Sequence, residues 1–308
     1  MNTHTSLSGT VALMHWGVIR AQGVDAVSFL QGQLTQDVAK LGAHSAALAG
    51  YCSPKGRLLA SFVICKPAAD EVLLLCHYSV LAATLKRLQM FVMRAKCKLT
   101  DATAELPLFG AVGDAAIALF GDLMSDLPAW GRSENCLRLP DAEGLPRVVL
   151  IAPNPVPVPS LNLDDWKWLE VRSAIATIEV ATVDQFVPQM LNYEQLGGVN
   201  FQKGCYPGQE IVARSQFRGT IKRRAYLFET DGVIGVGQEV FHSSDAAQPA
   251  GLVVNAARNP AGAGSGDGFS ALVEVKMASL ESGSLHVGAA EGATLKLCAL
   301  PYAMTLEI

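Results

Sequence analysis

The sequence lacks the paired cysteines that zinc sites and disulfide frameworks need. It has seven cysteines in 308 residues, and no two of them are separated by only two residues. The odd count and the spacing argue against both a structural zinc site and a disulfide framework, so we expect a reducing compartment. The six histidines also show no metal-ligand spacing. We therefore expect no bound metal.

Long hydrophobic runs and charge of one sign are also missing. No apolar stretch reaches the roughly 20 residues that span a bilayer, and the first residues show no basic segment followed by an apolar one. The formal net charge is only −4, which gives no overall attraction to nucleic acid or anionic membranes. We expect a soluble cytoplasmic protein without a membrane partner, in which any contact with nucleic acid depends on a local patch.

Apolar residues are abundant. Hydrophobic residues make up 50% of the chain and charged residues 17%, a balance typical of a well-packed globular protein. Strand and helix patterns alternate up to about residue 218, and only short β-type runs between glycine-rich turns follow. The sequence predicts an α+β region, residues 1–218, and a small C-terminal β-barrel, residues 219–308. The α+β region divides into two subdomains, near 1–105 and 106–218, with segments that could be exchanged between them.

Several segments carry local signals. Residues 11–16 and 17–21 are apolar-rich and suit two strands that pair with each other. Asn162 or Asp164 is a candidate N-cap for a helix that ends near Arg172. The glycine-rich run 261–268 lacks the phosphate-binding patterns, so we interpret it as a hairpin tip.

The least generic passage lies between residues 197 and 210. Its glycines and its proline cannot lie inside a helix or a strand, so we expect a loop whose backbone approaches a partner closely. A helix is expected to begin at about Gly208, and its free N–H groups favour a nearby anion by roughly 0.3–1 kcal/mol. Cys205 precedes that helix and lies beside Lys203. Both neighbours favour a thiolate, the nucleophilic form of cysteine.

The other cysteines differ from Cys205 in their surroundings. Cys52 adjoins a turn, and the remaining five lie in apolar or strand-like segments that are typical of inert packing thiols: Cys65, Cys76, Cys97, Cys136 and Cys298. The alternative for Cys205 is likewise a buried structural thiol. A Cys–His pair could arise only through folding, because no histidine adjoins Cys205 in the sequence.

Residues 203–210 resemble the K-G-C-Y-x-G-Q-E signature of the YgfZ family, folate-binding proteins related to tRNA modification and to the glycine-cleavage T protein, an aminomethyltransferase. The signature is highly specific, and the likeness covers most of residues 16–224. The C-terminal part resembles the family only in its series of short β-type runs. The resemblance identifies the functional loop with Lys203, Gly204, Cys205, Tyr206, Gly208, Gln209 and Glu210.

The resemblance implies a T-protein-like fold, in which two α+β subdomains bind tetrahydrofolate or a derivative between them and a β-barrel follows. Two family tryptophans associated with folate correspond to Trp16 and Trp166, and indole faces suit a flat pterin. From the pattern alone both are core residues, and Trp168 competes with Trp166 for the role. His15 is a weaker candidate for the same cavity. The sequence departs from the T protein at Arg172, where that protein has a glutamate that helps to hold the pterin.

A dense basic cluster follows the signature. It could contact tRNA phosphates or anchor the glutamate tail of folate, because guanidinium groups pair well with phosphate and carboxylate. The alternative is a solvated domain junction, which the lack of interleaved aromatic residues and of an RNA-binding signature favours. The cluster consists of Arg214, Arg218, Lys222, Arg223 and Arg224.

Three functions remain open. The resemblance favours a folate-binding accessory protein that supports iron–sulfur cluster assembly or repair, and thereby tRNA modification, with iron–sulfur enzymes or cluster-assembly proteins as partners. Cys205 and Lys203 would carry the chemistry, and replacing either with alanine is expected to keep the fold and abolish complementation of a strain that lacks the endogenous factor. The alternatives are a folate-dependent aminomethyl or one-carbon transferase, against which Arg172 counts, and an RNA-binding module. In the first case the chain is not a self-sufficient enzyme.

Overall fold

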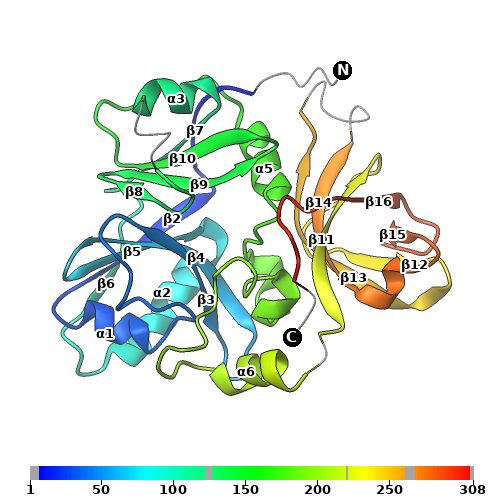
Figure 1. Cartoon of the computed structure of the whole chain (residues 1–308), viewed down its shortest axis with the longest axis horizontal. Coiled ribbons are helices and arrows are strands. Elements are labelled where there is room, and N and C mark those ends of the chain that lie inside the picture. Colours follow the sequence, from blue (N-terminus) through cyan, green and yellow to red (C-terminus); the bar gives the residue numbers. More distant parts are fainter. Residues whose placement is uncertain (1–6, 122–126, 220, 261–267, 306–308) are drawn as a thin grey trace.

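The computed structural model describes residues 7–121, 127–219, 221–260 and 268–305. Within them the chain forms two five-stranded antiparallel sheets and a closed β-barrel, with the sheets stacked on one side of the molecule and the barrel on the other (Figure 1). The α+β architecture with a C-terminal barrel that the sequence predicts is confirmed. Among the described residues, no helix combines the length and the apolar character needed to cross a membrane.

The first sheet has the strand order β3-β4-β5-β2-β6, and helices α1 and α2 pack on one of its faces. Its central strand β5 reads Glu-Val-Leu-Leu-Leu-Cys-His and has five consecutive buried residues. Alternate side chains serve two cores: Val72 and Leu74 pack toward the helices, whereas Leu73 and Leu75 pack toward the second sheet. The elements are β2 (Trp16–Gln22), α1 (Ala26–Gln31), β3 (Ala46–Cys52), β4 (Leu58–Ala68), β5 (Glu71–His77), α2 (Tyr78–Val92) and β6 (Lys98–Asp101).

The second sheet has the order β1-β7-β10-β9-β8, and α3 packs on its outer side. The predicted pairing of residues 11–16 with 17–21 is wrong. Strand β1 pairs with β7, whereas β2 pairs with β5 and β6, because the chain crosses between the sheets after Ala12. The elements are β1 (Gly9–Ala12), β7 (Leu108–Val112), α3 (Asp114–Phe120), β8 (Arg132–Ser133), β9 (Cys136–Ala142) and β10 (Leu145–Ile151).

Helix α5 (Leu163–Arg172) connects the sheets to the barrel and packs against barrel strands β13 and β14. Its predicted cap is confirmed, since Oδ1 of Asn162 accepts a 3.1 Å hydrogen bond from the backbone N–H of Asp164. Short 3-10 turns, η1 (Val180–Thr182) and η2 (Pro188–Leu191), and helix α6 (Gln209–Phe217) follow before the barrel.

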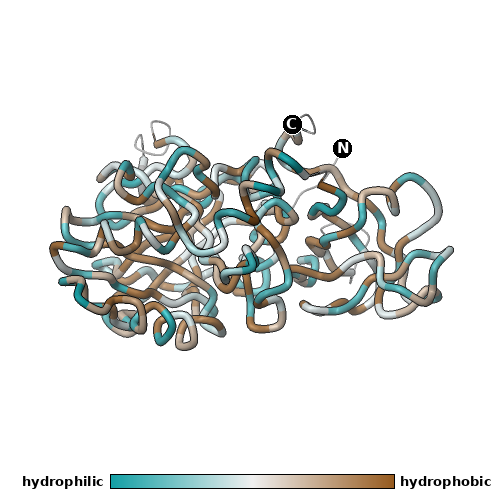
Figure 2. Tube along the Cα trace, turned by 90° about the horizontal axis from the view of Figure 1, so that it is seen from below, coloured by the Kyte–Doolittle hydropathy of each residue, from teal (hydrophilic) through white to brown (hydrophobic). Residues whose placement is uncertain are grey.

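The barrel has the order β11-β14-β13-β12-β15-β16, and pairing of β11 with β16 closes it. Hydrophobic segments run through the interior of both parts of the molecule, and hydrophilic ones lie on outer loops (Figure 2). Of the predicted hairpin tip, residues 261–267 lie outside the described residues. The elements are β11 (Arg223–Thr230), β12 (Glu239–His242), β13 (Asp245–Arg258), β14 (Phe269–Lys276), η3 (Met277–Leu280), β15 (Leu285–Val287) and β16 (Thr294–Cys298).

Candidate functional site

The signature loop turns sharply into α6 at Gly208. This residue has φ 78° and caps the helix, and a Cβ at its position would lie 2.4 Å from the backbone oxygen of Ser53. Only glycine fits there, because the conformation is left-handed and the backbone of the β3–β4 turn blocks a side chain. A Cβ on Gly56 in that turn would lie 2.8 Å from Cβ of Ile211. The loop is therefore fixed against the first sheet.

Lys203 points into the protein rather than toward solvent. Its side chain is buried, and Nζ donates hydrogen bonds to the backbone oxygens of Gln31 and Leu34, where α1 ends. The ammonium also lies 5.0 Å from the centre of the buried Tyr206 ring. Burial lowers the pKa of Lys203 to about 8, although Asp37 and Cys205 raise it. Lys203 thus ties the loop to α1, and we expect Lys203→Ala to weaken the fold, contrary to the sequence-based expectation.

Cys205 is exposed, whereas the other cysteines are buried or half-buried. Burial raises the pKa to about 12 for four of these thiols: Cys52, Cys65, Cys76 and Cys136. Cys205 thus differs from the packing cysteines in the solvent exposure of its side chain, as the sequence predicted. The alternative of a buried structural thiol at Cys205 is wrong.

The last two members of the predicted basic cluster do not form a surface patch. Arg224 is buried and forms a 2.7 Å ion pair with the equally buried Glu194. Arg223 binds the buried Glu274 through two nitrogens, one of them at 2.8 Å. Both arginines lie on β11, and their guanidinium groups neutralise carboxylates inside the fold.

The exposed remainder of the cluster is Arg214, Arg218 and Lys222. Arg214 lies 3.3 Å from Glu210, one helical turn earlier on α6, and both side chains are largely in solvent. Such a pair contributes little to stability. Glu210 therefore faces water and does not hold the loop.

A narrow cavity lies where the two sheets face each other beside α5. Strands from both sheets, α5 and the segment that follows α5 form its largely apolar wall. The polar groups on this wall include Trp16, Ser61, His77, Arg147, Glu170 and Thr177.

Two buried hydrogen-bond donors on the cavity wall have no partner among the described residues. They are Nε1 of Trp16 and Nη1 of Arg147, whose side chains are 8% and 1% exposed. Burying such a donor unpaired costs about 1–3 kcal/mol, and more for a charged group. The cavity is thus prepared for a ligand that brings hydrogen-bond acceptors.

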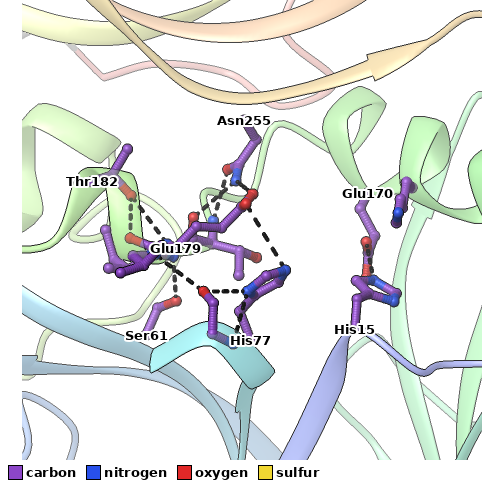
Figure 3. Close-up of polar contacts among 12 residues, drawn as sticks. His15, Ser61, His77, Glu170, Glu179, Thr182 and Asn255 are labelled. Atoms are coloured by element: carbon purple, nitrogen blue, oxygen red, sulfur yellow. Dashed lines mark hydrogen bonds and ion pairs between the residues drawn. The ribbon is translucent and has the colours of Figure 1, made fainter. Parts of the chain in front are cut away.

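Glu170 supplies the carboxylate of this cavity. Its Oε1 accepts a 3.0 Å hydrogen bond from Nε1 of Trp166. Its Oε2 lies 2.8 Å from Nε2 of His15 (Figure 3). Although burial raises the pKa of Glu170, contacts with His15, Trp166 and Arg147 lower it below the ordinary value. The group is ionised at neutral pH and can accept further hydrogen bonds.

The sequence-based role of Arg172 is corrected by its position. Arg172 does not line the cavity, because its guanidinium binds Glu143 at 2.5 Å and Glu229 at 2.9 Å. These ion pairs connect α5 to the second sheet and the barrel. Glu170, two residues earlier on α5, provides a carboxylate in the cavity.

Trp16 and Trp166, the two tryptophans predicted to contact folate, differ in their position relative to the cavity. Trp16 lines the cavity, but Trp166 is fully buried and lies outside its wall, packed where a Cβ on Gly110 would clash with the ring. Trp166 therefore acts on the cavity only through its hydrogen bond to Glu170. Trp168 is also occupied, donating a 3.1 Å hydrogen bond to Ser270 in the barrel.

A second, more polar pocket adjoins the first and shares Trp16, His77 and Glu170 with it. His77 points toward Glu179, with 3.9 Å between Nε2 and Oε2 (Figure 3). Burial, with a contribution from His15, lowers the pKa of His77 to about 4, so its ring is neutral at pH 7. His15 lines this pocket, as the sequence had suggested more weakly.

Across the same pocket, Asn255 of the barrel fixes the carboxylate of Glu179. Nδ2 of Asn255 donates a 3.0 Å hydrogen bond to Oε1 of Glu179 and another of 2.9 Å to the backbone of Thr177. Burial raises the pKa of Glu179 above its ordinary value. The barrel thus closes one side of the pocket and sets the position of its second carboxylate.

Sequence reasoning missed Arg147, Glu170 and His77. A signal existed for the first two: Arg147 interrupts the apolar strand β10, and Glu170 stands one helical turn after Trp166. The signature loop and the cavity are separate, since Cys205 lines neither of the two pockets. Among the residues that the structure describes, no group of three or more acidic, histidine or cysteine side chains could hold a metal ion.

Comparison with known proteins shows the relationship of the chain. No model of a protein family matches it. The tRNA-modifying protein YgfZ of Edwardsiella ictaluri (strain 93-146) is 30% identical over 75% of this chain and 72% of its own length. The protein of the same name from Enterobacter sp. (strain 638) is 31% identical, with 69% of each chain covered.

The fold has a solved counterpart. The crystal structure of the glycine cleavage system aminomethyltransferase T from Bartonella henselae matches 97% of this chain and 88% of that one, with a TM-score of 0.71 at 16% identity. This match confirms the predicted T-protein-like fold. Together with the identity and coverage of the curated relatives, it shows that the chain belongs to the YgfZ family.

Proposed function

We propose that the chain is a cytoplasmic folate-binding accessory protein that supports iron–sulfur cluster assembly or repair and, through it, tRNA modification. The cavity between the sheets carries this proposal. It combines an aromatic face at Trp16 with a buried carboxylate at Glu170 and an unpaired donor at Arg147. Relatives named for tRNA modification and a fold shared with an aminomethyltransferase support it.

Tetrahydrofolate fits the residues of this cavity. A pterin is flat and carries both hydrogen-bond donors and acceptors, so a narrow apolar cavity with a carboxylate and unpaired donors complements it. Glu170 would accept hydrogen bonds from the pterin, and Trp16 would pack on its face. The proposed binding unit is residues 1–218, to which β1 contributes by crossing into the second sheet.

The second part of the proposal concerns Cys205. An exposed thiol on a loop fixed by Gly208 and Lys203 can meet a partner protein without unfolding. We propose that it contacts iron–sulfur enzymes or cluster-assembly proteins. Its separation from the cavity means that folate and partner bind at different places. Direct tRNA binding has little support, because Arg223 and Arg224 are paired inside the fold.

Calorimetric titration with 5-formyltetrahydrofolate tests the folate part. We expect binding by the wild-type protein and at least a tenfold loss in Trp16→Ala, because a large aromatic contact of about 1.5–3 kcal/mol is removed. Phe217→Ala serves as control, since this side chain is 67% exposed on α6 and outside the cavity. Absence of binding to the wild-type protein would refute folate binding.

Complementation tests the accessory role. A strain lacking its endogenous factor should regain tRNA modification with the wild-type chain but not with Cys205→Ala. Cys97→Ala is the matched control, because Cys97 is half-buried near α1 and α2. Full activity of Cys205→Ala would refute the role of this thiol.

A folate-dependent one-carbon transferase is the second candidate function, and Glu179 favours it. This carboxylate lines the pocket next to the folate cavity, and burial raises its pKa toward the range of a general acid or base. An assay for one-carbon transfer to tetrahydrofolate decides between the two. Turnover that falls at least a hundredfold in Glu179→Gln would support a transferase, whereas tight folate binding without turnover supports the accessory role.

A further inference from the structure

Arg147 is the buried cation of the folate cavity, and its guanidinium is only partly satisfied. Nε and Nη2 donate to the backbone oxygen of Pro140 over 3.3 and 2.9 Å, and the group lies 5.7 Å from the centre of the Trp166 ring. Nη1 has no hydrogen-bond partner in the described part of the chain. Two nitrogens thus hold the guanidinium in place at the cavity wall, and the third is left without a partner.

A ligand of this cavity must supply hydrogen-bond acceptors, because the unpaired polar atoms on the cavity wall are donors. Of its lining atoms that are buried without a partner, Nη1 of Arg147 and Nε1 of Trp16 are both donors. The one carboxylate on the wall, Glu170, already accepts from Trp166 and contacts His15. No ion pair between Arg147 and Glu170 forms among the residues described, so the two groups offer separate recognition points, a donor on β10 and an acceptor on α5.

The charge of the cavity limits what can bind to Arg147. Arg147 and Glu170 balance each other, and Arg147 is 1% exposed. A ligand carboxylate placed there would bury a second negative charge beside Glu170, which is costly in a protein interior. A neutral carbonyl oxygen satisfies Nη1 without that cost. The glutamate tail of a folate is therefore excluded from this end of the cavity.

We propose that Arg147 is a specificity-determining residue that donates a hydrogen bond to the 4-oxo group of a 2-amino-4-oxo pteridine, while Glu170 accepts from the 2-amino group and N3–H. The inference rests on the proposed folate binding. On a pteridine these three groups occupy one edge, in the order donor, donor, acceptor. A carboxylate followed by a guanidinium N–H matches this order. A 4-amino group would instead direct a donor at Nη1.

Two ligands that differ at this position test the proposal: folic acid, with a 4-oxo group, and aminopterin, with a 4-amino group. Calorimetric affinities are measured at pH 7 for the wild-type protein and for Arg147→Met, which keeps an extended apolar side chain. We expect Arg147→Met to weaken folic acid roughly ten- to a hundredfold and to change aminopterin by less than about threefold. Arg147→Lys, which keeps a cationic donor, should retain part of the preference.

The outcomes separate the two proposals. An equal loss for both ligands, or no loss for either, overturns the role of Arg147 and leaves folate binding standing. Failure of folic acid, aminopterin and 5-formyltetrahydrofolate alike to bind the wild-type protein overturns folate binding itself. Binding of 5-formyltetrahydrofolate alone leaves folate binding standing and overturns the inference about Arg147. Circular dichroism and thermal unfolding of each variant verify the fold. If Arg147→Met does not fold, the same comparison in Arg147→Lys decides. A larger loss for folic acid than for aminopterin supports the role of Arg147, and an equal loss or no loss for the two ligands overturns it.

Discussion

Trp166 donates a hydrogen bond of 3.0 Å from its indole Nε1 to Oε1 of Glu170, one turn further along α5. The tryptophan is fully buried, so its ring fixes the direction in which the carboxylate points. On the other side His15 lies 2.8 Å from Oε2, and it comes from the short link between the two sheets. The position of the cavity carboxylate therefore depends on the packing of α5 against both sheets.

Glu170→Gln tests whether this carboxylate is held ionised. The pKa of Glu170 is lower in the folded protein than its ordinary 4.5, so its contribution to stability is present above about pH 4.5 and is lost as the pH falls through the folded pKa. We expect Glu170→Gln to lower the free energy of unfolding by roughly 1.5–3 kcal/mol at pH 7. Urea titrations at several pH values should show this difference shrinking in acid. A difference that stays constant down to about pH 3 would contradict the assignment.

Trp16 and Trp166 should respond oppositely to the same substitution. Trp166→Phe leaves Oε1 of Glu170 without its donor and should lower the free energy of unfolding by about 1–3 kcal/mol. Trp16→Phe removes an N–H that has no partner among the described residues, so stability should change little or rise. Urea unfolding measures both effects, and each variant serves as control for the other. Equal destabilisation would show that Nε1 of Trp16 is already bonded.

The sequence predicted the parts of the fold that depend on local pattern. Asn162 caps its helix, and the β-texture after residue 218 forms a barrel, because capping and alternation are set within a few residues. The partner of β1 was not predictable in this way. Strand pairing depends on contacts between residues far apart in the chain, and β1 pairs with β7 about a hundred residues later.

The candidate site was predicted only where a motif marks it. The glycine at 208 and the exposed Cys205 follow from the signature, whereas Arg147 and Glu170 belong to no motif and meet only when β10 and α5 pack together. Lys203 shows that proximity in the sequence does not determine which groups a side chain contacts in the fold. It lies two residues from Cys205, yet its ammonium binds carbonyl groups at the end of α1.

Lys203→Met tests the buried tie between the loop and α1. The pKa of Lys203 is about 8 in the folded protein and 10.5 in an unfolded chain, so between these values the unfolded chain binds more protons. The stability of the wild-type protein relative to Lys203→Met should therefore rise with pH across this window, by up to about 1.4 kcal/mol per pH unit. Chemical unfolding between about pH 7 and 10 measures it. A difference that falls with pH would mean that the charged form is favoured in the fold.

Thiol labelling tests the exposure of Cys205. Cys205 is open to solvent, whereas burial raises the pKa of Cys52, Cys65, Cys76 and Cys136 to about 12, so that thiolates are scarce there at neutral pH. We expect one fast reaction per chain with a chromogenic disulfide at pH 7.5, and the remaining thiols should react only in denaturant.

Cys205→Ser is the decisive variant for that experiment. It should abolish the fast reaction and change the free energy of unfolding by less than about 0.5 kcal/mol, because the side chain is exposed. Cys298→Ser is the control, since the pKa of this half-buried thiol is raised by burial and by Glu229. If the fast reaction survives in Cys205→Ser and disappears in Cys298→Ser, the reactive sulfur lies on the barrel, and the signature loop loses its proposed role as the contact to partner proteins.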